Sequence, residues 1–378
     1  MAKRDTVIVV RATDISSDAR SQKTVRWLAD AGWKVIHIYW ARGAPTEPPS
    51  WDDITFINLP ITGSHGRGLR NLLPLIKWNY HLYREIRKYR HSLIAIHAMD
   101  LDTAFPASWV CRSVGARFIY DICDFYSISR FPNGPAFLVS IARRLEMRIV
   151  RRADAVFMPS ESRTALFHGC VPKRLIITPN VPNIKPPQME RTSDRVFTVL
   201  YVGVLSNRRG LRELVRVVTR RPDWKLIIGG IGEDEDVIKE QVHDAENVSF
   251  IGKIPYHRVI ELTAESDALV VTYDPQFPNH RFSSPNKLYE GMMLGVPLVV
   301  ARGTGVDDDV MKYDLGEVVA YADEEELEAA LERISKKTKQ EKEAFFLRSS
   351  KLFETEFNPE SVSDRLTSLY RELCGEPS

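Results

Sequence analysis

The chain has 378 residues, a length that suits two or three domains of roughly 100–200 residues each. Hydrophobic residues make up 44% of it and charged residues 27%, which is typical of a globular protein with a substantial core. Because 52 basic residues stand against 50 acidic ones, the net charge is only +2 and does not indicate a nucleic-acid partner.

No apolar run approaches the roughly 18 residues of a membrane-spanning helix. The run Val7–Val10, followed by Arg11, is too short for the core of a secretory signal. The cysteines form no CxxC pair, which argues against structural zinc and against a disulfide framework. We therefore expect a cytoplasmic enzyme or binding protein.

Short β-rich runs alternate with amphipathic helical patterns along most of the chain, and the rhythm restarts at Thr198. Such alternation favours parallel sheets with helices on both faces. The helical patterns include Gln22–Ala31 and Ser140–Arg151, and charged helical segments end the chain, Glu324–Lys336 and Ser361–Leu373. The predicted strands are Thr6–Val10, Lys34–Tyr39, Ile54–Leu59, Leu93–His97, Phe118–Asp121, Ala155–Met158, Leu175–Thr178, Thr198–Val202, Lys225–Ile228, Val248–Ile251, Ala268–Val271, Leu298–Val300 and Glu317–Val319.

A linker separates the two series at Pro179–Pro187, whose prolines exclude a helix or a central strand. We predict an α/β protein of two doubly wound, Rossmann-like domains, 1–183 and 184–360. A C-terminal helix, 361–378, is expected to pack back on the first domain. Doubly wound sheets bind ligands beyond the carboxyl ends of their strands, so two such domains facing each other would enclose a central cleft.

The segment Ser283–Glu290 has the pattern of a helix start, with serine as the cap and Pro285 in the first turn. A helix N-terminus presents unpaired N–H groups and partial positive charge, which suit a phosphate. Lys287 and Glu290 are three residues apart and share a face. They either hold the diphosphate and the ribose of a nucleotide or form a surface ion pair.

A glycine turn follows the first strand of the second half, in Tyr201–Leu211. Gly203 would let the backbone approach a ligand, and Arg208 or Arg209 would neutralise phosphate charge. By itself this is a weak signal, and Gly229–Gly232 after the next strand is weaker still.

Taken in order, these motifs resemble a GT-B-type glycosyltransferase, most similar to the retaining family 4 group that uses nucleotide-sugar donors. In the second half the matching pieces are Tyr201–Leu211, Ile227–Gly232, Phe250–Ile254, Asp267–Tyr273 and Pro285–Pro297. In the first half they are Asp18–Arg20, Ile96–Asp100, Tyr120–Tyr126 and Arg152–Ser160, so the resemblance covers nearly the whole chain.

The resemblance implies a donor site in the second domain. Glu290 would bind the ribose, and Arg209 and Lys287 would face the diphosphate beside Gly203. Ser283 and Ser284 would offer backbone N–H groups to phosphate oxygens, and Lys253 and Ile254 would pass the nucleobase. Basic residues and a helix terminus stabilise the leaving diphosphate in such enzymes, so the resemblance implies no bound metal and no cofactor besides the donor.

At two positions this chain lacks a side chain that many family members carry in the donor site. Many members carry an acidic residue eight positions before the ribose-binding glutamate, where this chain has Phe282. Many carry arginine directly after the first glycine of the phosphate turn, where this chain has Val204.

The first domain would bind the acceptor. Asp18, Arg20, His97 and Asp124 follow or end predicted strands and are the candidates, with His97 and Asp124 close to the transferred sugar. Relatives commonly have histidine where Cys123 stands. Each candidate also has a purely structural interpretation, as a helix cap, a salt bridge or a core histidine.

Two charged segments are interpreted separately. The acidic run Asp307–Asp309 is expected to be solvated charge at a helix start rather than a metal site. The basic and aromatic segment 67–90 either contacts an anionic bilayer at the periphery or covers the sheet as an ordinary solvated helix.

The predicted function is therefore transfer of a sugar from a nucleotide-diphosphate donor, UDP- or GDP-linked, to a hydroxyl of a glycan or lipid-linked acceptor. The alternatives are a catalytically degenerate binding or scaffold protein, which the replacements at Phe282, Val204 and Cys123 favour, and a sugar-nucleotide epimerase. The donor sugar, the base and the acceptor do not follow from the sequence.

Overall fold

The structure is a computed structural model that describes residues 4–42, 47–63, 72–130, 134–187 and 195–377. It divides into two compact units, one formed by Met1–Pro179 with Glu360–Ser378 and the other by Asn180–Pro359. The division falls inside the predicted linker, a few residues before the expected boundary at 183/184, and the last segment of the chain belongs to the first unit.

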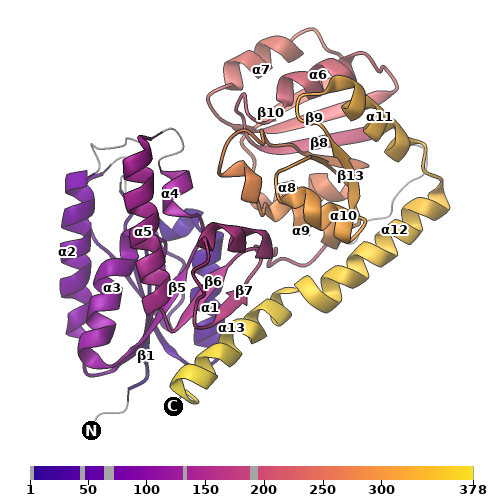
Figure 1. Cartoon of the computed structure of the whole chain (residues 1–378). Helices are drawn as coiled ribbons and strands as arrows, with labels where there is room; N and C mark the ends of the chain where they lie inside the picture. Colours follow the sequence, from indigo (N-terminus) through magenta and orange to yellow (C-terminus); the bar gives the residue numbers. More distant parts are fainter. Residues whose placement is uncertain (1–3, 43–46, 64–71, 131–133, 188–194, 378) are drawn as a thin grey trace. The chain divides into compact units, whose positions relative to one another are not determined.

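The first unit is built on a parallel sheet of seven strands in the described part of the chain, ordered β3-β2-β1-β4-β5-β6-β7 (Figure 1). Its strands are β1 (Thr6–Arg11), β2 (Lys34–Tyr39), β3 (Ile54–Asn58), β4 (Leu93–Met99), β5 (Arg117–Asp121), β6 (Ala155–Met158) and β7 (Leu175–Ile177). Its helices are α1 (Ala19–Asp30), α2 (Leu72–Lys88), α3 (Leu101–Val114), α4 (Tyr126–Ser129), α5 (Ala136–Arg152) and α13 (Pro359–Cys374), with short 3₁₀ turns at Ile15–Ser17 and Glu161–Phe167.

The second unit holds a parallel sheet of six strands among the described residues, ordered β10-β9-β8-β11-β12-β13. Its strands are β8 (Phe197–Val204), β9 (Trp224–Ile231), β10 (Val248–Gly252), β11 (Ala268–Val271), β12 (Leu298–Ala301) and β13 (Gly316–Val319). Its helices are α6 (Leu211–Thr219), α7 (Glu235–Val242), α8 (Tyr256–Ala264), α9 (Asn286–Leu294), α10 (Val306–Lys312), α11 (Glu324–Ser335) and α12 (Lys339–Leu352), with a 3₁₀ turn at His280–Phe282 and a π-helical turn at Phe353–Phe357.

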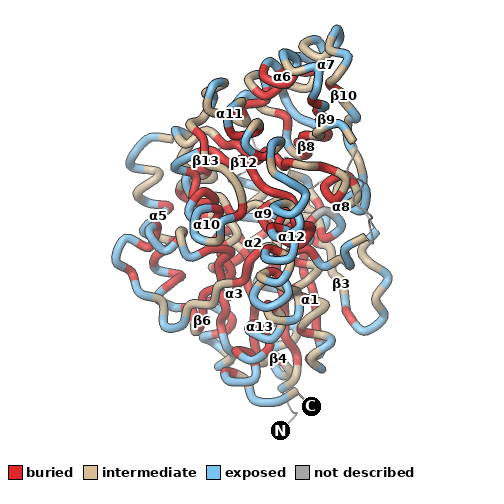
Figure 2. Tube along the Cα trace, turned by 90° about the vertical axis from the view of Figure 1, so that its right-hand side faces the viewer, coloured by how far each residue is buried: buried red, intermediate tan, exposed pale blue. Residues whose placement is uncertain are grey.

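The central strands are buried on both faces, which is why they appear in the sequence as continuous apolar runs. Buried residues follow the strands, while the outer faces of the helices are exposed (Figure 2). In the first unit, α1 and α13 pack on one face of the sheet, since Val25, Leu28 and Leu366 share a core cluster with Val7 and Val9. The predicted fold class, two doubly wound α/β domains, is confirmed.

In each sheet the strand order reverses once, between β1 and β4 in the first unit and between β8 and β11 in the second. At such a switch point the connections leave to opposite sides, so a crevice opens beyond the carboxyl ends of the two strands. Residues at these two points are therefore the ones best placed to bind a ligand.

Two local predictions need correction. Pro285, in an extended conformation, occupies the N-cap position of α9, so neither Ser283 nor Ser284 caps that helix. Asp307 is buried in the first turn of α10 and accepts hydrogen bonds from the amides of Gly303 (2.7 Å) and Thr304 (3.0 Å). It is a structural cap of the preceding loop rather than solvated charge.

Candidate donor and acceptor sites

The switch point of the second unit positions Arg209. This residue lies in the loop between β8 and α6, and its guanidinium stands 4.2 Å from the ring centroid of Tyr273. The hydroxyl of Thr272 donates to the carbonyl oxygen of Arg209 at 2.5 Å. Because Thr272 and Tyr273 directly follow β11, the loops after both switch-point strands hold this arginine. Its buried Nε has no hydrogen-bond partner among the described residues.

Lys287 reaches the same place from α9. A Cβ atom added to Gly203 would lie 2.9 Å from the Lys287 Nζ, so the glycine at the end of β8 leaves the room that the ammonium group occupies. Burial lowers the pKa of Lys287; the Glu290 carboxylate opposes this effect and the positive charge of Arg209 adds to it. The Arg209 guanidinium is thus near enough to lower the pKa of the ammonium group beside Gly203, and two neighbouring cations favour an anion between them.

A second glycine allows the loops to meet. Gly230, at the end of β9, has φ +137°, and a Cβ there would lie 1.8 Å from the Gly203 carbonyl oxygen. Only glycine fits this close approach. The turn that was a weak signal in the sequence therefore determines how tightly the two strand ends pack beside the Lys287 ammonium.

Glu290 lies one turn further along α9 and is only 3% exposed. Burial, and after it the negative charge of the nearby Glu290 carboxylate, raises the pKa of Tyr256, the first residue of α8. Sequence reasoning missed Tyr256 because it belongs to no motif; the only signal was its place just after the Lys253-Ile254 loop.

The other predicted donor residues lie around this group. Lys253 is exposed and Ile254 half-buried, in the loop between β10 and α8. Ser284 is buried next to the N-terminus of α9. The amide of Ser283 already donates to the Thr304 carbonyl oxygen at 3.0 Å, which contradicts the prediction that it serves a phosphate.

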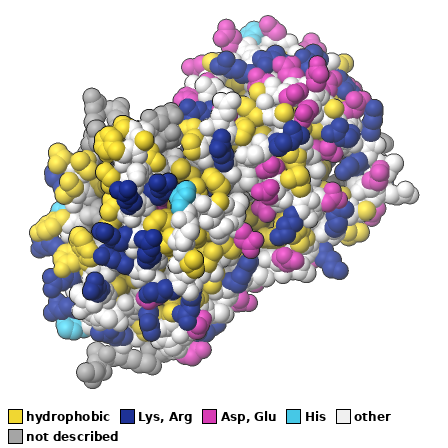
Figure 3. Space-filling view, viewed as in Figure 1, with side chains coloured by type: hydrophobic (Ala, Val, Ile, Leu, Met, Phe, Trp, Pro, Cys, Tyr) yellow, Lys and Arg dark blue, Asp and Glu magenta, His cyan; other side chains and the backbone are white. Residues whose placement is uncertain are grey.

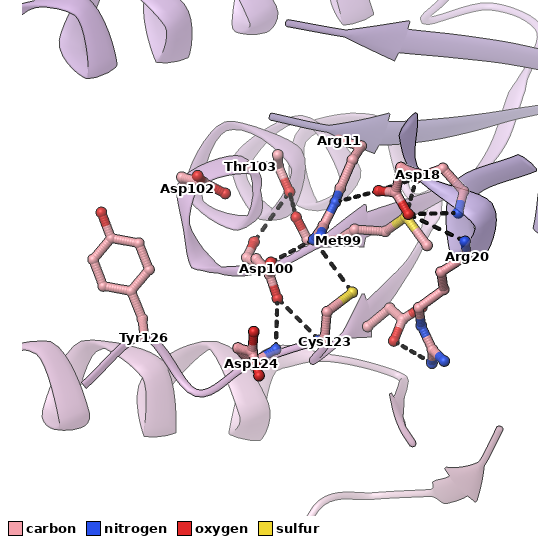
Figure 4. A network of polar contacts seen from close by, with 12 residues as sticks. Arg11, Asp18, Arg20, Met99, Asp100, Asp102, Thr103, Cys123, Asp124 and Tyr126 are labelled. Carbon is pink, nitrogen blue, oxygen red and sulfur yellow. Dashed lines mark hydrogen bonds and ion pairs between the residues drawn. The ribbon is translucent and has the colours of Figure 1, made fainter. Parts of the chain in front are cut away.

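Arg11, the last residue of β1, lies at the switch point of the first unit and contacts the loops that follow β1, β4 and β5 (Figure 4). Its Nε donates to Asp18 at 2.7 Å, and its terminal nitrogen donates to Asp100 and to the Cys123 sulfur (3.2 Å). Asp18 also accepts from the amides of Arg20 and Ser21 as the N-cap of α1. The Asp18 carboxylate is thus engaged in an internal ion pair and a helix cap.

Arg20 and His97 are also engaged internally. Arg20 binds both carboxylate oxygens of Asp121 at 2.7 and 2.9 Å and reaches Thr178. His97 has no exposed surface; its ring nitrogens lie 3.2 Å from Asp121 and 2.9 Å from the Tyr370 hydroxyl of α13. The prediction that His97 contacts a substrate is therefore wrong for this structure: it is a core histidine that orients Asp121.

Asp124 is the predicted acceptor residue that does reach the surface. Its side chain is 47% exposed and lies 3.3 Å from Arg163. Asp100 holds this loop, because its carboxylate accepts from the amides of Cys123 (2.9 Å) and Asp124 (3.2 Å). Asp100 itself adopts φ +61° and ψ 167°, a region that residues other than glycine rarely enter. Such strain is typical of functional loops, and no residue pattern around Asp100 predicts it.

Burial raises the pKa of the Cys123 thiol well above its ordinary value, and Asp100 adds to this effect while Arg11 opposes it. The residue that stands where relatives have histidine is thus a neutral thiol beside Arg11. Among the residues that the structure describes, there is no cluster of three His, Cys, Asp or Glu side chains arranged to hold a metal ion. The helices in the same described ranges include none long and apolar enough to cross a bilayer.

Comparison with known proteins supports the same division of the chain. The glycosyl transferase 4-like domain matches residues 18–180, and the glycosyl transferases group 1 family matches residues 186–345. The capsular polysaccharide biosynthesis glycosyltransferase CapM of Staphylococcus aureus is 26% identical over 189 residues, 48% of this chain and 47% of that one. The chain thus matches about half the length of this curated relative, and less of others.

Solved structures share the fold over nearly the whole length. The sucrose-phosphate synthase of Thermosynechococcus elongatus superposes with a TM-score of 0.78 at 18% identity, covering 98% of this chain and 99% of that one. HepE of Anabaena, in complex with UDP-glucose, superposes with a TM-score of 0.70 at 14% identity, covering 97% and 99%. With both halves matched in order and the two-sheet fold in place, the chain belongs to the GT-B-fold glycosyltransferases of the family 4-like group.

Proposed function

We propose that this protein transfers a sugar from a nucleoside-diphosphate-sugar donor to a hydroxyl group of a glycan or lipid-linked acceptor. The observation that carries the proposal is the proximity of the Arg209 charge to Lys287, which lies beside Gly203, with the buried carboxylate of Glu290 one helical turn along α9. A cationic pair and a carboxylate at this spacing suit a diphosphate joined to a ribose.

In this proposal each part of the donor has its own partner. Arg209, Lys287 and the N-terminal end of α9, with its partial positive charge, hold the diphosphate. Glu290 accepts hydrogen bonds from the ribose hydroxyls, and the Lys253-Ile254 loop passes the base. HepE, which has the same fold, is known in complex with UDP-glucose, and this supports a uridine nucleotide as the first choice.

The chemistry follows from where negative charge develops. As the bond between the sugar's anomeric carbon and the diphosphate oxygen breaks, the two cations stabilise the leaving diphosphate. The acceptor oxygen forms its bond on the same face, and its proton passes to a phosphate oxygen, so the anomeric configuration is retained. We propose that no bound metal or further cofactor takes part, because Arg209, Lys287 and the helix terminus supply the positive charge.

The acceptor side is proposed to lie at the switch point of the first unit. Asp124, the half-exposed carboxylate there, is the group that would bind an acceptor hydroxyl, held in place by Asp100 and Arg163. Asp18, Arg20 and His97 support this region from inside. The function of the CapM relative in capsular polysaccharide biosynthesis supports a glycan acceptor.

The experiment that tests the donor site is calorimetric titration of UDP and GDP. Glu290→Ala removes two hydrogen bonds to a charged group, about 3 kcal/mol, and should weaken the affinity for the preferred nucleotide roughly 100-fold. Glu246→Ala, at an exposed position of the same unit, is the matched control and should bind as the wild type does. Equal affinity of Glu290→Ala and wild type for both nucleotides would show that the donor site lies elsewhere.

Turnover distinguishes the remaining functions. A transferase releases UDP or GDP from a nucleotide-sugar panel in a manner that depends on an added acceptor. An epimerase instead changes the donor sugar without any acceptor. A binding or scaffold protein takes up the nucleotide and changes nothing. The family matches favour the first outcome.

We further propose that the protein works at the periphery of a membrane, on its cytoplasmic side. Of the predicted contact segment 67–90, Arg67 and Arg70 lie outside the described residues. The rest, mostly α2, exposes apolar side chains such as Leu73 (71%) and Ile76 (57%). Its exposed basic residues are Lys77, Arg84, Arg87, Lys88 and Arg90.

The neighbouring helices have the same character. On the face of the sheet that α2, α3 and α5 cover, hydrophobic and basic side chains gather together (Figures 1 and 3). Trp109 on α3 and Phe137 on α5 are 58% and 64% exposed. The acidic residues of these two helices, Asp102 and Glu146, are buried. A surface of exposed apolar and cationic groups suits an anionic bilayer.

A further inference from the structure

We infer that Tyr273 and His280 are positioning residues for Arg209. Their packed rings hold the guanidinium in place of an acidic partner, so that the arginine keeps its charge and its N–H groups for the diphosphate of the donor. This inference rests on the proposed function of the second unit. It concerns how the site keeps a cation in place before the donor arrives, which no motif of the chain addresses.

The first step is how Arg209 is held. Its amide donates to the Ser206 carbonyl oxygen at 3.0 Å, and its own carbonyl oxygen accepts from the Thr272 hydroxyl at 2.5 Å. Its guanidinium carbon lies 4.2 Å from the centroid of the Tyr273 ring. In the part of the chain that the structure describes, no carboxylate pairs with this guanidinium and its buried Nε has no hydrogen-bond partner. The side chain is thus held by a ring and not by an acid.

A ring and a carboxylate hold an arginine in different ways. A carboxylate binds the N–H groups at the edge of the guanidinium, so a phosphate that arrives later has to compete for them. An aromatic face attracts the cation and leaves those N–H groups to other partners. A buried N–H group without a partner also costs free energy. A phosphate oxygen can satisfy the Nε of Arg209, which is such a group.

His280 keeps the ring of Tyr273 in its place. The centroid of the His280 ring lies 5.3 Å from that of Tyr273 and 4.8 Å from that of Phe277. Phe277 in turn carries the guanidinium of Arg208 at 4.2 Å. The Nδ1–H of His280 donates to the Asp274 carbonyl oxygen at 3.1 Å, which ties the ring to the loop after β11. His280 therefore fills the space between two rings that each support an arginine.

His280 suits this place because its ring is neutral. Burial lowers the pKa of His280 to about 4; the charges of Arg209 and Arg208 add to this effect, and Asp274 opposes it. At neutral pH the imidazole thus carries no charge. It packs between the two rings without repelling either arginine.

A competing role for Tyr273 is direct contact of its hydroxyl with the nucleoside part of the donor. The two roles differ in which part of the tyrosine matters and in which part of the nucleotide responds. Positioning of Arg209 depends on the ring and affects a ligand that carries phosphates. Direct contact depends on the hydroxyl and affects the nucleoside as well.

The experiment measures the affinity of the full chain for UDP by calorimetric titration and for uridine by displacement of UDP, or for GDP and guanosine if the wild type prefers GDP. Tyr273→Leu removes the ring under Arg209 and should weaken UDP binding about tenfold. Its affinity for uridine, which has no phosphate, should change by no more than about twofold. Tyr273→Phe keeps the ring and should bind both ligands as the wild type does.

A second pair of variants tests the histidine. His280→Ala should weaken UDP binding roughly threefold, the effect of losing an aromatic contact. His280→Phe supplies a neutral ring again and should recover most of this loss. The melting temperature of each variant shows whether it is folded, and the His280 pair decides the outcome if Tyr273→Leu is not.

The control variant is Tyr313→Leu, which removes a ring 4.8 Å from the Lys312 ammonium elsewhere in the same unit; it should bind both ligands as the wild type does. Unchanged UDP affinity of the folded ring-deletion variants overturns the inference. Equal losses for UDP and uridine, or a Tyr273→Phe variant as weak as Tyr273→Leu, also overturn it. If Arg209→Gln still weakens UDP binding, only this inference fails. If neither Arg209→Gln nor Glu290→Ala weakens it, the proposed donor site fails as well.

Discussion

His37 is a histidine in the middle of β2, with no exposed surface and its ring stacked on that of Tyr39 at 5.7 Å. Burial lowers its pKa from 6.5 to about 4; the Asp18 carboxylate opposes this effect, and the Arg11 guanidinium adds to it. The folded protein therefore holds this ring neutral at pH values where the unfolded chain is protonated.

The sign of the pH dependence follows from this shift. Below pH 6.5 the unfolded state binds a proton that the folded state refuses, so stability falls as the pH decreases from about 6.5 to about 4. The full effect is about 3 kcal/mol at roughly 1.4 kcal/mol per pKa unit. We expect His37→Leu to lose less stability than the wild type over this interval, measured by urea unfolding at a series of pH values.

Other groups titrate in the same pH interval. The effect of His37 is therefore the difference in the free energy of unfolding between the wild type and His37→Leu at each pH. Burial also raises the pKa of Asp100 to about 6. Protonation of Asp100 therefore stabilises the folded state of both proteins as the pH falls, which is opposite to the effect of His37. Parallel stability curves for His37→Leu and wild type would contradict the assignment to His37.

At the scale of elements, α13 completes the first unit from the far end of the chain. Leu366, Leu369 and Leu373 belong to the core cluster that also holds the strand residues Val7 and Val9. The Tyr370 hydroxyl lies 2.9 Å from the His97 ring. This helix therefore supplies part of the hydrophobic face and the partner of a buried polar group.

We predict that Leu366→Ala, at a position that is 2% exposed, lowers the free energy of unfolding of the first unit by about 2–4 kcal/mol, because it leaves a cavity under α13. Glu372→Ala on the same helix breaks only a surface ion pair with Arg174 (2.6 Å) and should cost less than about 1 kcal/mol. Urea unfolding followed by tryptophan fluorescence measures both. Similar losses for the two variants would show that α13 does not anchor this unit.

At the scale of the whole molecule, the question is whether the surface of α2, α3 and α5 docks on a bilayer. Wild type should sediment with vesicles that contain phosphatidylglycerol and remain in solution with pure phosphatidylcholine, and the binding should weaken as salt rises. Leu73→Ser with Ile76→Ser should reduce the bound fraction several-fold, because the loss of apolar burial weakens interfacial binding.

The matched control removes apolar side chains that are equally exposed in the second unit. Met311→Ser with Leu347→Ser, at positions 60% and 62% exposed, should bind the vesicles as the wild type does. Binding that ignores lipid charge, or that both double variants reduce alike, would point to general hydrophobic adhesion.

Much of the architecture was predictable because strands, helices and linkers each have a characteristic pattern of apolar, polar and proline residues over a few positions. Each predicted strand corresponds to an observed one, since a strand buried on both faces requires a continuous apolar run such as Ala268–Val271. The prolines after Ile177 placed the linker. The donor residues Gly203, Arg209, Lys287 and Glu290 were assigned from the family resemblance, and their role in binding a donor stays a prediction.

The sequence by itself therefore determined the two doubly wound units, the linker Pro179–Pro187 in which they divide and the family to which the chain belongs. Only the tertiary structure decided which polar residues at the strand ends are buried and which reach the surface. His97 and Asp124 follow neighbouring strands in the same way, yet α13, returning from 273 positions away, buries the first, and the second stays 47% exposed. Burial depends on which distant elements cover a position, and that information is not contained in the residues around it.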